Sequence, residues 1–270
     1  MNNFEYYIET DSFICKYAKG KPAVRGIEFH EYDEAVLFLS GNIKFVSKEI
    51  QATLQPNDVV WIAREQFHQF IASKEKPYIR CIVAIKKTSL LAPVLSETIN
   101  GVSVNRQNSS INDVFKKIIN TLTSQLPKQQ KEILLDALIT QLVFERKQSN
   151  QHPVEKALNP SSFISRVISY IDENYDKNLT IKQIANELYI SESNLSHRFR
   201  KELNISVYQY ITEKRLSTIR QYVSSGYSIG HASILCGFND YGNFYRICKS
   251  HYGVNPSKLL TMKNTNCTQK

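Results

Sequence analysis

The feature that most constrains the fold of this 270-residue chain is an approximate repeat near its C-terminus, with an offset of 48 residues. Thr-Ile-Lys-Gln-Ile-Ala at 180–185 corresponds to Ser-Ile-Gly-His-Ala-Ser at 228–233. Each copy begins with a hydroxyl side chain, which favours a helix N-cap because it can accept a hydrogen bond from an unpaired backbone N–H. A turn and a second helical pattern follow in both copies. The repeat therefore predicts two helix-turn-helix units.

The second helix of each unit is predicted to begin after a capping residue, Ser191 in one copy and Asn239 in the other. An amphipathic stretch at 207–223 predicts a helix that bridges the units. The apolar face of the second helices is predicted to hold Leu195 and Phe199, and then Phe244 and Cys248. The opposite, exposed faces would hold Ser193, Asn194, Ser196, His197 and Arg200, and then Tyr241, Gly242, Asn243 and Arg246. Such a face can enter the major groove of DNA.

The charge of the chain is concentrated in this segment. The net charge is +9, and residues 156–270 carry 15 Lys and Arg against 8 Asp and Glu, whereas residues 1–155 carry 19 against 17. A basic segment beside a near-neutral one suggests a polyanionic partner, with nucleic acid as the first candidate. A basic surface that only aids solubility is the alternative. Two helix-turn-helix units within the basic segment favour DNA.

The first hundred residues instead show short β patterns. Segments 35–39 and 43–46 flank Ser40-Gly41-Asn42, which is typical of a β-hairpin, and further segments lie at 51–54, 59–62 and 78–85. They predict a small barrel or sandwich. Two amphipathic helices are predicted at 112–126 and 131–146, on either side of Leu126-Pro127. Their apolar faces are expected to hold Val114, Phe115, Ile118, Ile119 and Leu122, and then Leu134, Leu135, Leu138, Leu142 and Val143.

These patterns predict an α+β chain in three parts. Residues 1–147 would form a domain of strands and helices, 148–160 a linker, and 161–270 an all-α domain with the two helix-turn-helix units. The first residues lack a secretory pattern, and the apolar runs are too short to cross a membrane. Five scattered cysteines argue against a disulfide framework and a structural zinc site, and favour a reducing, cytoplasmic location. No cofactor or bound metal is predicted.

Residues 165–262 resemble the DNA-binding domain of the AraC/XylS family of bacterial transcription regulators. The first copy carries Leu-Thr-Ile at 179–181, Ile-Ala at 184–185, and Ser191 with Leu195 and Phe-Arg-Lys-Glu at 199–202. The second copy carries the more specific part: Cys-Gly-Phe-Asn-Asp at 236–240, Phe-Tyr-Arg at 244–246 and Tyr-Gly-Val-Asn-Pro-Ser-Lys at 252–258. The resemblance implies a sequence-specific regulator, an activator, that contacts RNA polymerase and reads two successive major-groove segments. It implies that residues 1–147 are a regulatory and dimerisation domain and that residues 161–270 bind DNA.

The resemblance also implies DNA contacts at particular positions. It maps base contacts to Ser193, Ser196, His197, Tyr241, Gly242 and Arg246. Arg246 is the strongest candidate because a guanidinium can bond bidentately to guanine. A phosphate or structural role for Arg246 is the alternative. Phosphate contacts are expected from Ser191, Arg198, Lys201, Tyr241 and the helix that starts at Ser228.

Residues 20–90 show a fainter similarity to the cupin-like regulatory domain of that family, with Gly26-x-Glu28-x-His30-x-x-x-Glu34, a Leu54-x-Pro56-Asn57-Asp58 turn and His68. Glu28, His30, Glu34 and His68 could in principle bind a divalent metal. A hydrogen-bonded His–acid pair is the favoured interpretation. A small-molecule effector in the barrel is expected, with its contacts drawn from Glu28, His30, Val36, Phe38, Trp61 and His68. Trp61 could stack on such a ligand, but packing in the core is the favoured interpretation. Control by a partner protein or by the amount of the regulator, without a ligand, is the alternative.

The helical segment is expected to supply a homodimer contact through Leu135, Leu138 and Leu142, as the resemblance implies. Packing of the same face on the barrel is the alternative. A cupin-type metal-dependent enzyme with an association-only helical half is the competing function. The duplicated helix-turn-helix favours the regulator, so no catalytic residues are expected.

Overall fold

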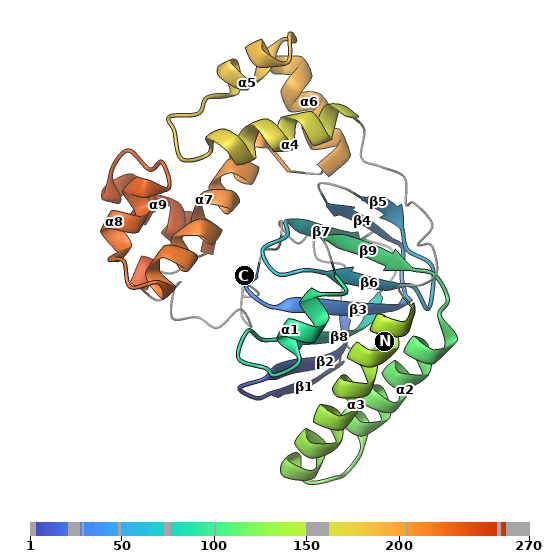
Figure 1. Ribbon diagram of the computed structural model, residues 1–270. Coiled ribbons are helices and arrows are strands. Elements are labelled where there is room, and N and C mark those ends of the chain that lie inside the picture. The colour runs from blue at the N-terminus through green and yellow to red at the C-terminus, as the bar shows by residue number, and fades with distance from the viewer. Residues whose placement is uncertain are drawn as a thin grey trace. The chain divides into compact units, whose positions relative to one another are not determined.

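A computed structural model describes residues 4–20, 28, 30–47, 50–72, 77–99, 101–149, 162–203, 205–252 and 255–257 (Figure 1). The chain divides into two compact units, Met1–Pro160 and Ser161–Lys270. The first unit combines strands with helices and the second is helical among its described residues, so the predicted α+β class is confirmed. Helix α3 extends to Ser149. Of the predicted linker at 148–160, residues 150–160 lie outside the described part.

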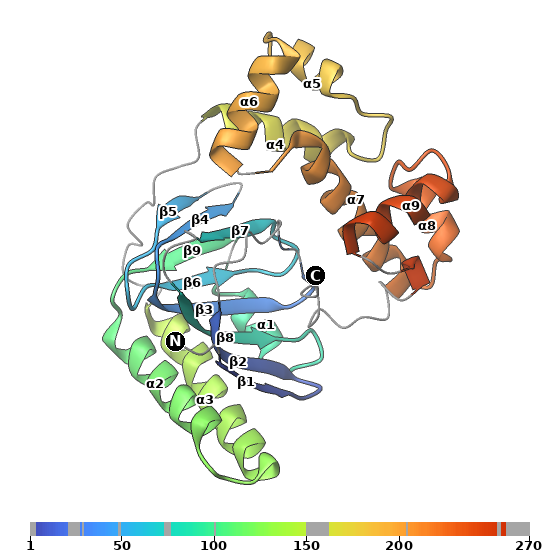
Figure 2. The ribbon, with the colours of Figure 1, turned by 180° about the vertical axis from the view of Figure 1, so that it is seen from behind.

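The N-terminal unit contains two antiparallel sheets. The larger sheet has the strand order β1-β2-β8-β3-β6-β9, and the smaller has the order β5-β4-β7 (Figures 1 and 2). The bounds in the larger sheet are Phe4–Glu9 for β1, Phe13–Gly20 for β2, Asp33–Ser40 for β3, Val59–Ile62 for β6, Tyr78–Ile85 for β8 and Val102–Asn105 for β9. Those in the smaller sheet are Ile43–Ser47 for β4, Gln51–Thr53 for β5 and His68–Ala72 for β7. The predicted stretches at 35–39, 43–46, 51–54, 59–62 and 78–85 all contain strands.

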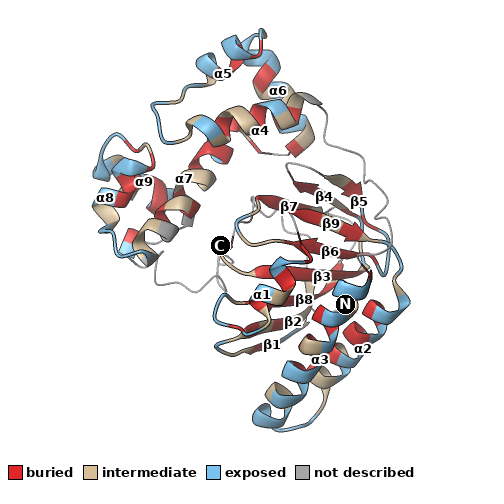
Figure 3. Ribbon diagram, in the orientation of Figure 1, coloured by how far each residue is buried: buried red, intermediate tan, exposed pale blue. Residues whose placement is uncertain are grey.

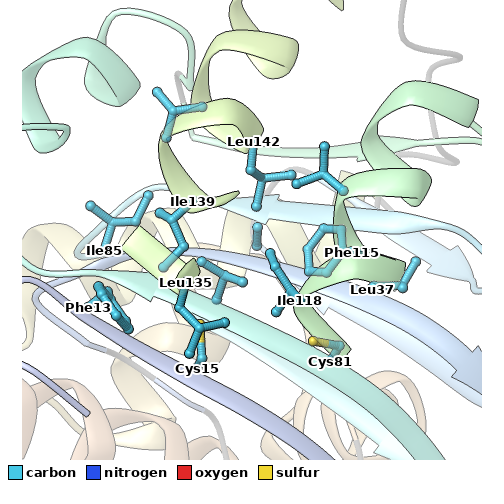
Figure 4. Packing of buried hydrophobic residues seen from close by; sticks show 14 of the residues in the cluster. Phe13, Cys15, Leu37, Cys81, Ile85, Phe115, Ile118, Leu135, Ile139 and Leu142 are labelled. Carbon is cyan, nitrogen blue, oxygen red and sulfur yellow. The ribbon is translucent and has the colours of Figure 1, made fainter. Parts of the chain in front are cut away.

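Both faces of the larger sheet are covered. One face packs on the helices α2 (Ser109–Thr123) and α3 (Lys128–Ser149), with Phe115, Leu135 and Leu142 in the shared core (Figure 4). The other face meets the smaller sheet through a second core that includes Phe38 and Phe45. The short helix α1 (Ala92–Ser96) adds Leu95 to the first core. Figure 3 shows the same division, with the outer faces of α2 and α3 exposed.

The predicted hairpin at Gly41 is wrong. Strand β3 pairs with β6 and β8, while β4 pairs with β5 and β7 in the other sheet. Gly41 has φ +130°, and a Cβ at this position would lie 3.3 Å from the backbone oxygen of Pro77. The turn residues therefore carry the chain from one sheet to the other instead of returning it alongside β3.

The predicted apolar face of α3 is wrong at one residue. Leu134 is 44 % exposed and does not belong to the buried face. The other predicted members of both faces are buried or partly buried against the core. The periodicity thus placed the helices correctly, and the break at Leu126-Pro127 separates α2 from α3 as expected.

The C-terminal unit contains helices throughout its described range. Helix α4 (Ser162–Asn174) precedes the first helix pair, α5 (Ile181–Glu187) and α6 (Glu192–Leu203). Helix α7 (Val207–Ser224) leads to the second pair, α8 (Ile229–Leu235) and α9 (Tyr241–Tyr252). The predicted bridging helix is confirmed as α7. The buried residues Leu195, Phe199, Phe244 and Cys248 form the predicted apolar faces.

Candidate nucleic-acid interface

The two helix pairs have the same local construction. In each, a helix of 7 residues is followed by a turn and a helix of 12 residues. The turn is closed by the N–H of Ile190, which donates to the oxygen of Ala185 at 3.0 Å, and by the N–H of Phe238, which donates to the oxygen of Ser233 at 3.1 Å. This hydrogen bond is typical of a helix that ends at a left-handed residue.

That left-handed residue occupies the equivalent place in both turns. It is Tyr189 with φ +56° in the first and Gly237 with φ +84° in the second. Glycine adopts this conformation without steric cost, whereas a tyrosine does not. The offset of 48 residues in the sequence therefore corresponds to one repeated backbone geometry.

Each of the four helices begins at a side-chain cap. The hydroxyl of Thr180 accepts from the N–H of Gln183 in a capping box, and that of Ser228 accepts from the N–H of His231. Ser191 accepts from the N–H of Asn194 at 3.2 Å. In α9 the cap is Asp240, whose carboxylate accepts from the N–H of Asn243 at 2.7 Å. The prediction of Asn239 as this cap is wrong by one residue. The Asp240 carboxylate beside the N-terminus of α9 could have suggested the actual cap.

The second turn packs closely on the end of α4. A Cβ on Gly237 would lie 2.7 Å from the oxygen of Asp176 and 2.8 Å from that of Tyr175. From α7, Arg215 donates to the oxygens of Tyr175 and Lys177, each at 2.8 Å. The guanidinium of Arg215 also lies 5.5 Å from the ring centroid of Phe238. These contacts link the first helix of the unit to the second helix pair, and sequence reasoning did not identify them.

The outer faces of α6 and α9 carry polar and basic side chains. On α6, Ser193, Asn194, His197, Arg200 and Lys201 are exposed, while Ser196 and Arg198 are half-buried. On α9, Tyr241, Gly242 and Arg246 are exposed and Asn243 is half-buried. The structure therefore places every predicted base-contact residue on one of these two helices, whereas the predicted phosphate contacts at Ser191 and Ser228 precede α6 and α8. Their exposed donors, hydroxyls and cations match the groups that bind bases and phosphates.

Three of the predicted contact residues also have intramolecular contacts. The guanidinium of Arg198 lies 3.7 Å from the ring centroid of Phe163, so this side chain packs α6 against α4. The hydroxyl of Ser191 serves as the cap of α6. Arg246 donates weakly from Nε to the oxygen of Gly242 at 3.4 Å, which leaves the two terminal nitrogens of its exposed guanidinium directed away from that bond.

The residues predicted to contact an effector in the N-terminal unit do not lie in one place. His30, Glu34 and His68 come together in a buried cluster, and Glu28 forms an isolated bridge with His68 through backbone hydrogen bonds of 2.7 and 3.1 Å. Phe38 is fully buried in the core between the two sheets. Trp61 is fully buried on the opposite face of the larger sheet, where Arg146 lies 5.3 Å from its ring centroid. Trp61 is therefore a core residue and lies apart from the other predicted effector contacts.

The buried histidines differ in their electrostatics. Burial alone would lower the pKa of His30, but the Glu34 carboxylate and its hydrogen bond to the ring outweigh burial and raise this pKa. Burial lowers the pKa of His68, and the neighbouring His30 lowers it further. His30 therefore favours its charged form, and His68 favours its neutral form.

The predicted dimer residues lie inside the unit. Leu135 and Leu142 are fully buried against the larger sheet, and Leu138 is partly buried on the same core (Figure 4). This arrangement matches the alternative in which the face packs on the sheets, and Leu135 and Leu142 are unavailable to a second subunit. The exposed apolar residues of α3 are Ile133, Leu134 and Phe144.

Comparisons with known proteins agree with this construction. A family model described as a helix-turn-helix domain matches residues 184–262. The transcriptional activator AggR of Escherichia coli is 24 % identical over 260 residues, covering 88 % of this chain and 93 % of AggR. The arabinose operon regulatory protein of E. coli K12 is 29 % identical over 151 residues, covering 54 % of this chain and 50 % of that protein.

Among solved structures, that of fatty-acid-bound ToxT from Vibrio cholerae matches with 16 % identity and a TM-score of 0.43, covering 96 % of this chain and 99 % of ToxT. In the part of the chain that the structure describes, none of the helices has the length and apolar character needed to span a bilayer.

Two capped helix-turn-helix pairs with exposed polar second helices, matched by a helix-turn-helix family model, define a DNA-binding transcription regulator. The C-terminal unit carries an AraC-type helix-turn-helix domain, and the relatives of the chain are bacterial transcription regulators.

Proposed function

We propose that this regulator binds specific DNA sites by placing α6 and α9 in successive major-groove segments. The observation that supports the proposal most strongly is the equivalence of the two helix pairs, in turn geometry, helix length and exposed face. A single helical hairpin is common in helical bundles. Two equivalent pairs in the basic half of the chain provide two groove-reading helices per monomer.

Within this proposal some side chains contact bases and others contact phosphates. Arg246 reads a guanine, because its guanidinium is exposed on α9 and can bond two acceptors at once. Ser193, Ser196 and His197 on α6, with Tyr241 and Gly242 on α9, complete the base contacts. Arg200 and Lys201 bind phosphates, with the hydroxyl-capped helix starts at Ser191 and Ser228 presenting backbone N–H groups.

The DNA is bent in the proposed complex, or the two helix pairs are splayed. Successive major-groove segments on one side of B-DNA are about 34 Å apart. Helix α7 has 18 residues and at 1.5 Å per residue spans about 27 Å. Bending of the duplex would shorten the distance between the groove segments, and its cost would depend on the sequence being bent.

The remaining parts of the proposal concern regulation. The N-terminal unit modulates DNA binding through a small-molecule effector or a protein partner, and the bound protein contacts RNA polymerase as an activator. AggR, a relative over most of the chain, is named an activator, and another relative is named for the arabinose operon. Homodimerisation would use the exposed apolar residues of α3 rather than the buried leucines. The protein would act in the bacterial cytoplasm, without catalytic activity of its own.

The test is to recover bound genomic fragments and measure the affinity of the full chain for them against salt. The proposal predicts a linear fall of log K with log salt, with a slope of about −0.9 for each phosphate contacted. Selected fragments should bind at least about a thousandfold tighter than random duplex. A slope near zero, or equal affinity for selected and random duplex, would refute sequence-specific binding. The neighbouring genes would indicate the class of effector.

A further inference from the structure

Three ionisable side chains share a buried position between the two sheets of the N-terminal unit. His30 lies just before β3, Glu34 is on β3 of the larger sheet, and His68 begins β7 of the smaller sheet. Their relative exposures are 4 %, 4 % and 1 %. One ligand atom from each lies within 4.8 Å of the other two. Burying three such groups together is costly unless something compensates them.

The hydrogen bonds of the two imidazole rings define which atoms face the centre of the cluster. Nδ1 of His30 lies 2.8 Å from the oxygen of Tyr32, and Nδ1 of His68 lies 3.1 Å from the oxygen of Gln66. A carbonyl oxygen can only accept, so each Nδ1 carries a proton and donates it. In the neutral rings, Nε2 therefore presents a lone pair to the cluster.

The carboxylate of Glu34 faces both of these nitrogens. Its Oε2 lies 3.2 Å from Nε2 of His30 and 3.6 Å from Nε2 of His68. Within the described residues, Nε2 of His68 is a buried atom without a hydrogen-bond partner. Two imidazole lone pairs and a carboxylate oxygen thus converge. One proton on His30 would satisfy the His30–Glu34 contact alone, whereas a cation at the centre would satisfy all three atoms.

We propose that His30, Glu34 and His68 bind a divalent first-row transition metal. Two imidazoles and one carboxylate are a ligand set that suits Zn²⁺, Fe²⁺ and neighbouring ions. With metal–ligand bonds of 2.0–2.2 Å, adjacent ligand atoms in a tetrahedral site are about 3.3–3.6 Å apart. The two separations between the carboxylate and an imidazole, 3.2 and 3.6 Å, are close to this value, and all three ligand atoms lie within 4.8 Å of one another.

The surroundings hold the ligands in this orientation. Metal-binding histidines usually donate their second ring N–H to a carbonyl or carboxylate, as both rings do here. The ring of His30 stacks on Tyr32 with a centroid distance of 4.0 Å. The ring of His68 packs beside those of Phe45 and Phe70, at centroid distances of 6.3 and 5.8 Å. The ligand atoms are therefore positioned before any ion arrives.

A metal here would join the two sheets directly, because Glu34 belongs to one sheet and His68 to the other. An ion that binds only the folded unit stabilises it in proportion to the logarithm of its concentration over Kd. We expect the N-terminal unit to melt about 5 °C higher or more at saturating Zn²⁺ than in chelator. Because this property needs no DNA, its test is independent of the proposed function.

The experiment uses the full chain, stripped with a chelator and titrated separately with Zn²⁺ and with Co²⁺, whose visible absorption reports its ligand geometry. The expected result is one ion per chain with a raised melting temperature. His68→Gln should bind at least tenfold more weakly. The matched control is His231→Gln, since His231 is an exposed histidine on α8 and outside the cluster. That variant should bind like the wild type.

The wild-type titrations test ion binding even if His68→Gln fails to fold. Glu34→Gln provides a second variant whose side chain has nearly the same shape as that of the wild type. A wild-type chain that takes up neither ion and shows no thermal shift would overturn the proposal. So would uptake that is unchanged in both His68→Gln and Glu34→Gln, because surface sites would then account for it. Protonation of the cluster without ion uptake is the result expected if the site is only a buried His–acid network.

Discussion

The repeated turn geometry leads to a pair of substitutions with opposite expected effects. Gly237 and Tyr189 occupy equivalent left-handed positions, with φ +84° and φ +56°. A residue with a Cβ loses about 1–2 kcal/mol in this conformation. In Gly237→Ala the new Cβ would also lie 2.7 Å from the oxygen of Asp176, so the backbone between α4 and α5 must move. Such overpacking adds about 1–3 kcal/mol.

We therefore expect Gly237→Ala to destabilise the second helix pair by about 2–5 kcal/mol. Tyr189→Gly should do the reverse. Tyr189 is 92 % exposed, so little buried surface is lost. Relief of the left-handed strain exceeds the extra chain entropy of glycine, for a net gain of about 0.5–1 kcal/mol.

The assay is hydrogen exchange of the full chain, read by mass spectrometry on peptides from α5–α6 and from α8–α9. Protection should fall in α8–α9 for Gly237→Ala and rise in α5–α6 for Tyr189→Gly. Each helix pair provides the internal control for the other variant. Unchanged protection in Gly237→Ala, or a loss of protection in Tyr189→Gly, would refute the steric and conformational reasoning.

Three further predictions concern binding, packing and thiol reactivity. Arg246→Ala should weaken specific DNA binding by about 1–3 kcal/mol and relax the preference for one base. Lys128→Ala on α3 is the control and should leave both the affinity and the base preference unchanged. An equal loss of affinity on all sequences would assign Arg246 to a phosphate contact. Leu142→Ala should cost about 2–5 kcal/mol in urea unfolding, while Gln141→Ala, at an exposed site on the same helix, should stay within about 0.5 kcal/mol. A small effect at Leu142 would contradict its core position. Burial raises the pKa of Cys236 to about 12, so this thiol should resist alkylation at about pH 8 in the native chain and react in urea; rapid native labelling would contradict its burial.

The helical unit was largely predictable because its signals are local. Caps, turns and 3.6-residue periodicity all lie within a few residues of one another, and the repeat at 48 residues doubled each signal. The error at Asn239 arose because two adjacent residues can both cap a helix, and Asp240 does so. The packing of Gly237 against the end of α4 is a long-range contact, and a glycine in a turn gives no information about its distant neighbour.

The sheet unit was less predictable because strand pairing is not local. Strand β3 is buried over six consecutive residues, from Asp33 to Phe38, since both faces of its sheet are covered. Without alternation of polar and apolar residues, the sequence does not indicate which face each side chain occupies. For this reason the sequence does not separate Phe38 from Trp61, which lie in two different cores.

The same limit applies to the histidine cluster and to the helices. His30 and Glu34 are four residues apart, but their meeting with His68 depends on how β7 of one sheet faces β3 of the other. On α3, periodicity identified an apolar stripe with Leu135 and Leu142 and left open whether a sheet or a second subunit covers it. The structure shows that the sheet does.

The central claim is that one chain reads DNA with two equivalent helix-turn-helix pairs. Guanine-methylation interference on a bound genomic fragment tests it most directly, because the methyl group blocks N7 in the major groove. Two groove-reading helices per chain should give two clusters of interfering guanines on one side of the duplex, about 10–10.5 base pairs apart. Arg246→Ala should abolish one cluster and leave the other. A single cluster with the wild-type chain, or no interference at any guanine, would contradict the account.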